Sequence, residues 1–388
     1  MARRTVVLLD VERNVFVRDA SLSPADVPGA ARSWSVRKRA LEGGLREGVE
    51  VVEIECGRLR AVLLPTRGMG IWKAWWGDLE IGWQSPARGP VHPRFVPLEQ
   101  PDGLGWLRGF DELLCRCGLE SNGAPEWDER GRLRWPLHGR IANLPAHELS
   151  VSVDGDLGEV SVRGVVDETR LFGSKLRLIS TTTLRSGEPR LRVRDEVVNL
   201  SGEPGGLELL YHVNLGHPVV EPGARIVLPA RELSPRDARA IARLDEWDRC
   251  GAAAPGRGEE VFLGELFVGE RGRTRALLVG PDGDRGVSLS YDTGELPCFT
   301  LWKNPQLAAD GYVCGLEPGT NYPNRRSFEE LRGRVVALAP GERRGFTLDL
   351  EIHPDRANVE QAEAEVARIA AGRAPIVHPD TAPRFAPL

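Results

Sequence analysis

Hydrophobic and polar residues alternate in short runs along most of this chain. Alternation with a period of two turns one face of an extended strand toward a core and the other toward water, so each run predicts a β-strand. Turn-forming pairs such as Asp-Gly and Ser-Gly separate the runs and favour a meander of antiparallel strands. The predicted strands are Ser33–Ala40, Glu50–Glu55, Leu59–Leu64, Gly70–Trp76, Glu80–Trp83, His147–Val153, Glu159–Val166, Lys175–Leu184, Arg190–Val198, Leu207–Asn214, Arg225–Leu228, Val261–Phe267, Thr274–Val279, Gly286–Tyr291, Cys298–Trp302, Tyr312–Leu316, Arg334–Leu338 and Gly345–Ile352.

The opening segment, residues 1–10, predicts one more strand, because its apolar run is too short for a signal peptide. Helical patterns are few: Asn358–Ala371 is amphipathic with glutamates near its start, and Asp237–Cys250 is a second candidate. About twenty short strands are typical of an all-β sandwich, here one of two very large sheets. No linker divides the chain, so we expect a single domain over 1–388, with N-terminal strands in 1–48 and a C-terminal helix and tail in 355–388.

Residues 84–137 interrupt the strand pattern and are rich in Pro, Gly and Trp. A long irregular insert in a compact domain is uncommon unless it is functional or disordered. Its apolar and aromatic content argues against disorder. We therefore interpret it as the wall of a pocket.

Composition narrows the classes of partner. The 388 residues carry a net charge of −5 with a pI near 5.9, and lysine and arginine are spread along the sequence, which argues against nucleic acid or an anionic membrane as the main partner. No segment is apolar for the length of a transmembrane helix. The six cysteines lack the spacing of a disulfide scaffold, so we expect reduced thiols and a cytoplasmic location, with Cys115 and Cys117 structural.

The segment Gly311–Asn324 contains the first candidate for chemistry. A buried strand, Tyr312–Leu316, leads into Glu317, and Pro318 and Gly319 then forbid a helix and predict a stiff loop. A carboxylate fixed at the end of a strand suits proton transfer.

Two histidines have a similar context. His138 directly follows the insert, and His212 lies where an apolar strand becomes polar. Arg67 stands at a glycine-flanked turn, and Trp302, Lys303 and Asn304 form another polar strand end. Nucleotide-binding loops, nucleophile elbows and zinc-protease motifs are absent from the sequence. The residues therefore favour an acid–base site for a small neutral substrate, with one or two tryptophans able to stack on a sugar ring.

Four segments, in this order along residues 50–350, together resemble the aldose 1-epimerase (galactose mutarotase) superfamily, and within it a bacterial subfamily of largely unassigned function. They are Pro65-Thr-Arg-Gly-Met-Gly70, Leu137-His-Gly139, Tyr211-His-Val-Asn-Leu-Gly216 and Gly315-Leu-Glu-Pro-Gly319. The segments Gly118-Leu119, Gly123-Ala-Pro125 and Leu137–Asn143 resemble the subfamily.

The resemblance implies a β-supersandwich of large antiparallel sheets and the interconversion of sugar anomers by ring opening. By position, Glu317 would be the base at the anomeric hydroxyl, His212 the acid at the ring oxygen, and His138 its support. Acid–base ring opening needs no cofactor and no metal. The expected partner is a small sugar, and a homodimer is compatible with the sequence. The predicted substrate-binding residues are Arg67, Asn214, Arg140, Trp302, Lys303 and Asn304.

Two other functions stay open at this stage. A sugar-binding or regulatory protein could use the same scaffold without turnover, because a fold does not determine a function. A metal-dependent sugar lyase or epimerase could use His138, His212 and Glu317 as ligands, because two histidines and one carboxylate can hold a metal ion.

Overall fold

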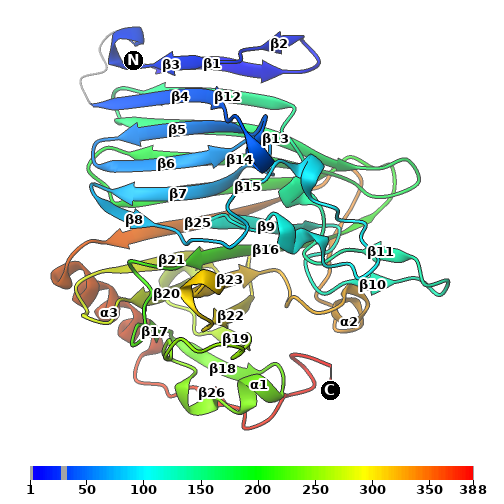
Figure 1. Cartoon of the computed structure of the whole chain (residues 1–388), viewed down its shortest axis with the longest axis vertical. Helices are drawn as coiled ribbons and strands as arrows, with labels where there is room; N and C mark the ends of the chain where they lie inside the picture. The colour runs from blue at the N-terminus through cyan, green and yellow to red at the C-terminus, as the bar shows by residue number, and fades with distance from the viewer. Residues whose placement is uncertain (1–2, 28–32, 388) are drawn as a thin grey trace.

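A computed structural model describes residues 3–27 and 33–387, and in this part of the chain two large β-sheets are stacked face to face (Figure 1). Residues 1–2, 28–32 and 388 of the predicted single domain lie outside the described residues. One sheet has ten strands, in the order β17 (Arg225–Val227), β20 (Arg273–Val279), β21 (Gly286–Asp292), β25 (Arg343–His353), β15 (Arg190–Asn199), β14 (Lys175–Arg185), β13 (Glu159–Thr169), β12 (Glu148–Asp154), β1 (Arg3–Asp10) and β2 (Val15–Phe16).

The other sheet has fourteen strands among the described residues. Its order is β26 (Ile376–Val377), β18 (Ala230–Pro235), β19 (Glu260–Leu266), β22 (Cys298–Asn304), β23 (Val313–Gly319), β16 (Gly205–Leu215), β9 (Leu114–Leu119), β7 (Gly70–Trp76), β6 (Leu59–Leu64), β5 (Glu50–Cys56), β4 (Trp34–Ala40) and β3 (Ala20–Leu22), with β8 (Leu79–Ile81) beside β7 and β24 (Val336–Leu338) beside β16. A small hairpin of β10 (Glu126–Trp127) and β11 (Leu133–Trp135) stands apart. The pairing is antiparallel except between β18 and β26. The all-β prediction, with large antiparallel sheets and a C-terminal helix, is confirmed.

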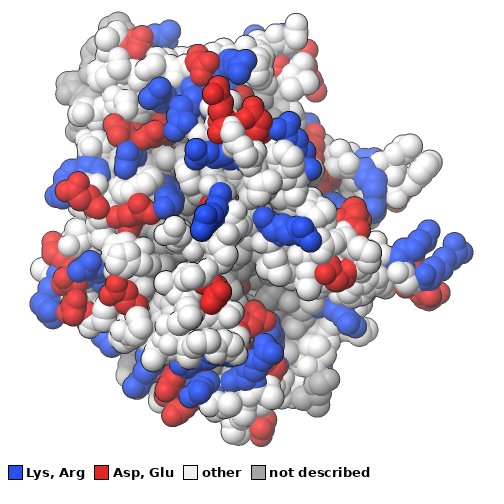
Figure 2. All heavy atoms as spheres, in the orientation of Figure 1, with Lys and Arg blue, Asp and Glu red and all other residues white. Residues whose placement is uncertain are grey.

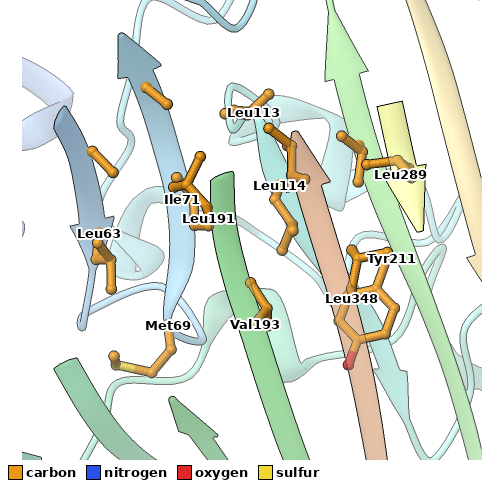
Figure 3. Close-up of a cluster of buried hydrophobic side chains, with 14 of the residues drawn as sticks. Leu63, Met69, Ile71, Leu113, Leu114, Leu191, Val193, Tyr211, Leu289 and Leu348 are labelled. Carbon is orange, nitrogen blue, oxygen red and sulfur yellow. The ribbon is translucent and has the colours of Figure 1, made fainter. Parts of the chain in front are cut away.

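The main core fills the space between the sheets. Figure 3 shows Ile71, Leu114 and Tyr211 of the larger sheet lying close to Leu191 and Leu348 of the smaller one, and all belong to one buried cluster. Alternating residues of each strand supply these side chains, as the period-two pattern predicts. The core therefore fixes which residues of β16 and β9 point away from it, on the opposite face of the larger sheet.

The α-helices of the described residues lie outside the sheets. They are α1 (Ala238–Ile241), α2 (Arg326–Leu331) and α3 (Arg356–Ala370), and α3 packs Val359, Ala362 and Val366 on the ten-stranded sheet. The helix predicted at 358–371 is confirmed. The helix predicted at 237–250 is wrong beyond α1, because the later backbone groups bond elsewhere: the carbonyls of Glu246 and Arg249 accept from the Lys303 ammonium. No helix of the described residues is long and apolar enough to cross a membrane.

Two strand predictions need correction. β23 does not end at Leu316 but continues through Glu317 to Gly319, because proline excludes a helix yet fits an extended strand. β9 lies inside the predicted irregular insert. The sequence pattern does not reveal this strand, because Leu-Cys-Arg-Cys-Gly-Leu is buried on both faces and shows no alternation.

A buried ion pair joins the two sheets. Arg116 of β9 meets Asp195 of β15, with Nε 2.5 Å from Oδ2 and Nη2 3.0 Å from Oδ1. The hydroxyl of Tyr211 donates to the same carboxylate at 2.8 Å. Arg116 also donates to Ser180 Oγ of β14 and to the Met69 carbonyl. Each charged side chain of this cluster has an oppositely charged partner and further hydrogen bonds, as buried charges require.

We expect Asp195→Asn to destabilise the protein strongly, by about 3–5 kcal/mol, because it leaves the buried Arg116 charge uncompensated. Urea-induced unfolding measures the effect. The control is Glu196→Gln, the next residue along, whose exposed pair with Arg343 should contribute about 1 kcal/mol or less. Equal effects of the two substitutions would contradict the assignment of the inter-sheet pair as a main stabilising contact.

Candidate active site

Strand register brings the predicted carboxylate and imidazole together. β16 pairs with β23 through Leu210–Gly319 and Val213–Leu316, which sets His212 opposite Glu317. The ladder is interrupted between these pairs because Pro318 has no N–H to donate. His212 and Glu317 are both buried, at 4% and 2% exposure, on the sheet face that points away from the main core.

The two side chains face each other closely, with His212 Nε2 3.3 Å from Glu317 Oε1. The two groups are thus in direct reach of each other and are not separated by the width of a sugar ring. Asn214, two residues further along β16, places its Oδ1 2.7 Å from His212 Nδ1. The Asn214 amide group donates to the carbonyls of Glu112 and His212, so its oxygen is the acceptor and His212 Nδ1 carries the hydrogen. Asn214 is thus a positioning residue for His212.

Gly315 leaves the space that Glu317 occupies. A Cβ at this position would stand 2.6 Å from Glu317 Oε1 and 3.1 Å from the indole of Trp302. The carboxyl therefore folds back over its own strand at Gly315, which only a glycine allows without displacing it.

His138 approaches the pair from the turn that directly follows the insert. Its backbone has a φ of 57°, and its N–H donates to the Gly123 carbonyl. A non-glycine residue with positive φ is a strained position that surrounding structure must hold. His138 Nδ1 lies 2.8 Å from the Asn122 carbonyl, and its ring centroid is 5.4 Å from that of His212. The loop thus holds a second imidazole beside the first.

Aromatic rings surround the imidazoles. Trp106, in a 3₁₀ turn at Gly105–Arg108, lies 4.5 Å from His138 between ring centroids. Phe110 lies 4.9 Å and Trp302 5.2 Å from His212. The insert therefore supplies two of the rings packed around the imidazoles, Trp106 and Phe110, and its interpretation as the wall of a pocket stays a prediction. Figure 2 shows the surface hollowed near the middle of its face, where Figure 1 draws β16, β22 and β23.

A charged pair that the sequence did not point to lies beside Trp302. Glu259, directly before β19, accepts from Trp302 Nε1 at 2.9 Å and from Arg236 Nη2 at 2.7 Å. Arg236 also donates to Asp237 Oδ2 at 2.8 Å. No local pattern could have found Glu259 or Arg236, since only sheet pairing brings them to the site.

Burial determines the protonation of the central groups. It raises the pKa of Glu317 well above the ordinary 4.5, and the nearby Glu259 charge adds to the effect. Burial also lowers the pKa of His212 well below 6.5, with a contribution from His138, and lowers the pKa of His138 to about 4. Burial alone would raise the pKa of Glu259, but the Arg236 guanidinium holds it below its usual value. The site thus has neutral central groups and an ionic rim.

The predicted strand end 302–304 does not act as a unit. Successive residues of a strand point to opposite faces, so Lys303 points away from the face on which Trp302 meets the site. Lys303 is buried on the other side, 3.0 Å from Glu260. Asn304 donates to the carbonyls of Asp310 and Gly311 and stabilises a turn. Lys303 and Asn304 are therefore corrected from substrate-binding to structural positions.

The two predicted arginines are engaged elsewhere. Arg67 is buried and donates to Glu112 at 2.5 Å, to Asn143 and to the Val91 and Gly109 carbonyls. It anchors the insert just before Phe110, which is a supporting role. Arg140 pairs with Glu99 at 3.0 Å. The structure thus brings together Glu317, His212, His138, Asn214 and Trp302, and not these arginines.

The thiols and the metal alternative can be judged on the same geometry. Cys115 and Cys117 are buried in one cluster with Trp106 and Phe110, in agreement with a structural role.

Among residues 3–27 and 33–387, no group of three or more His, Cys, Asp or Glu has an arrangement that could hold a metal ion. The described residues therefore give no support to the proposed ligand set of His138, His212 and Glu317.

Comparison with solved structures gives matches along nearly the whole chain. A "putative aldose 1-epimerase" from Klebsiella pneumoniae subsp. pneumoniae is 31% identical, covers 98% of both chains and superposes with a TM-score of 0.94. A galactose mutarotase-like protein from Clostridium acetobutylicum shares the fold at 17% identity, 82% and 98% coverage and a TM-score of 0.57. A "putative aldose 1-epimerase" from Escherichia coli K12 does so at 16% identity, 79% and 99% coverage and a TM-score of 0.51. The comparison with curated proteins finds no match.

Fold and site together define a galactose mutarotase-like protein of the aldose 1-epimerase superfamily, as the sequence predicts. Residues 46–352 match one family in particular. The chain belongs to this family, which is described as "Domain of unknown function (DUF4432)".

We expect His138 to remain neutral in the folded protein down to a pH of about 4. In the unfolded chain a histidine takes its proton near 6.5, so the unfolded state binds more protons between these values. The contribution of His138 to stability therefore falls as the pH drops from about 6.5 toward 4. An NMR titration of its ring protons, assigned with His138→Gln, measures the midpoint. A midpoint near 6.5 would contradict the burial of this ring.

Proposed function

We propose that this protein interconverts the anomers of a small aldose by acid–base ring opening, an aldose 1-epimerase activity. The observation that carries the proposal is the 3.3 Å contact of His212 with Glu317 inside an aromatic-walled site on the mutarotase-like fold. The name of the 31% identical Klebsiella protein supports the same reaction.

The chemistry fits two adjacent proton-transfer groups. Opening a cyclic hemiacetal removes a proton from the anomeric hydroxyl and adds one to the ring oxygen. Both oxygens are bonded to the same carbon, so an acid and a base that lie side by side can serve them. General acid–base catalysis of this kind contributes about 10²–10⁴-fold to a rate.

An uncharged sugar suits the charges of the site. Each cationic side chain predicted to bind substrate, or found beside the pair, is already neutralised by a carboxylate. The ion pairs are Arg67–Glu112, Arg140–Glu99, Lys303–Glu260 and Arg236–Glu259. A phosphorylated sugar would find none of these four cations without a carboxylate partner. The half-buried indole of Trp302 offers an apolar face for the C–H side of a sugar ring.

We expect Glu317→Gln and His212→Gln each to lower the rate of anomer exchange by about 10²–10⁴-fold, because each removes one proton-transfer group. Exchange NMR over a panel of free and phosphorylated aldoses, with substrate far below saturation, measures the rate. The control is His217→Gln, a solvent-exposed histidine paired with Glu221, which should keep the wild-type rate.

Wild-type exchange in the Glu317→Gln variant would contradict the proposal. If the unmodified protein binds a sugar in calorimetry and leaves its exchange at the uncatalysed rate, the protein is a sugar-binding module on the same scaffold.

A further inference from the structure

Glu317 is partnered differently from the other buried carboxylates of the described residues. Glu208 Oε1 also lacks a hydrogen-bond partner, but the other oxygen of Glu208 accepts from the Asn122 N–H. Asp195 has a guanidinium and a phenol as partners, and Glu112 has the Arg67 guanidinium and the Asp111 N–H. Glu260 pairs with Arg257 and Lys303. Glu317 Oε1 is buried and has no hydrogen-bond donor from the protein. An ionised carboxylate without a donor or a cation is costly in such a place, and the neutral acid is favoured.

The atom that Glu317 faces is an acceptor. Asn214 takes the hydrogen of His212 Nδ1, as its amide orientation requires, and a neutral imidazole then has a lone pair on Nε2. This lone pair lies 3.3 Å from Glu317 Oε1. This close approach is not a formed hydrogen bond. Because Nε2 carries no hydrogen, a proton that joins the two side chains can come only from the carboxyl.

The other groups around Glu317 leave this arrangement in place. The ionisable groups near the pair are His138, Cys115, Cys117, Glu259 and Arg236, with Cys314 on the core side of β23. His138 also donates its Nδ1 hydrogen to a carbonyl, and burial contributes to raising the pKa of the Cys117 and Cys314 thiols. Arg236 is shared between Glu259 and Asp237 and contacts neither member of the pair. No neighbour among the described residues thus supplies a positive charge directly to Glu317.

We propose that Glu317 and His212 share a single proton that rests on the carboxyl, so that Glu317 is the proton donor of the site and His212 Nε2 the acceptor. This reverses the roles that the sequence resemblance implies. The reaction that we assign to the pair rests on the proposed function. The position of the proton does not depend on it.

In the proposed reaction the charges stay balanced. The Glu317 hydroxyl gives its proton to the ring oxygen as the C1–O5 bond breaks and its electron pair moves to that oxygen. His212 Nε2 takes the proton of the C1 hydroxyl, and a C1=O bond forms. Carboxylate and imidazolium then stabilise each other until rotation about C1–C2. Reclosure returns both protons, so the pair begins and ends neutral.

The test is spectroscopic and needs no turnover. At neutral pH, the infrared difference between wild type and Glu317→Gln should contain the carbonyl stretch of a protonated carboxyl. Nitrogen-15 NMR should show His212, assigned with His212→Gln, as neutral with its hydrogen on Nδ1. The control Glu259→Gln should show only ionised-carboxylate bands, since Glu259 pairs with Arg236.

A second variant, Asn214→Asp, should shift the proton from Glu317 to His212. Asn214→Asp keeps the shape but places a carboxylate on Nδ1, which favours the imidazolium. We expect His212 to become doubly protonated and the carboxyl band of Glu317 to disappear. Asn358→Asp on α3, outside the site, should change neither signal. If Asn214→Asp does not fold, the wild-type spectra still decide.

An imidazolium at His212 and an ionised Glu317 in the wild-type protein would overturn the proposal. A His212 that stays neutral in folded Asn214→Asp would overturn the role of Asn214. These results are independent of anomer exchange: spectra as expected without turnover would refute the proposed function and leave the shared proton standing.

Discussion

The Arg116–Asp195 ion pair fixes the distance and registration of the two sheets, and the site depends on both. Tyr211 donates to Asp195 from the core face of β16, and His212 follows directly on the opposite face. Because successive strand residues alternate, any contact that locks Tyr211 inward also aims His212 outward. A charge cluster inside the sandwich thus sets the orientation of the imidazole outside it.

The same sheet registration explains how neighbouring strands build the candidate pair. Glu317 needs no loop to reach His212, because the two residues are cross-strand neighbours. Asn214 is on the same face two residues along, and Trp302 lies diagonally on the next strand. Groups placed on rigid strands are held more tightly than groups on loops, which suits proton transfer over a short distance.

The sequence predicted the strand architecture well, and the structure supports part of the site that it predicted. His212 and Glu317 could be found because motif and strand pattern agreed. Lys303 could not be placed from its neighbour Trp302 without knowing which face of β22 meets the site. Leu114–Leu119 was hidden because a strand buried on both faces loses its alternation. Glu259 gave no signal, since its partners are distant in sequence and only folding joins them.

The sheet and the insert contribute different side chains to the candidate site. The sheet supplies the proton-transfer pair, whose geometry follows from hydrogen-bonded register. The insert supplies Trp106 and Phe110, His138 follows it directly, and the buried Arg67–Glu112 pair ties the insert to the sheet. Glu112 links the two parts, because its carbonyl accepts from Asn214. A change of insert sequence could therefore reshape the aromatic surroundings of the candidate site while the strands hold Glu317 and His212 in place.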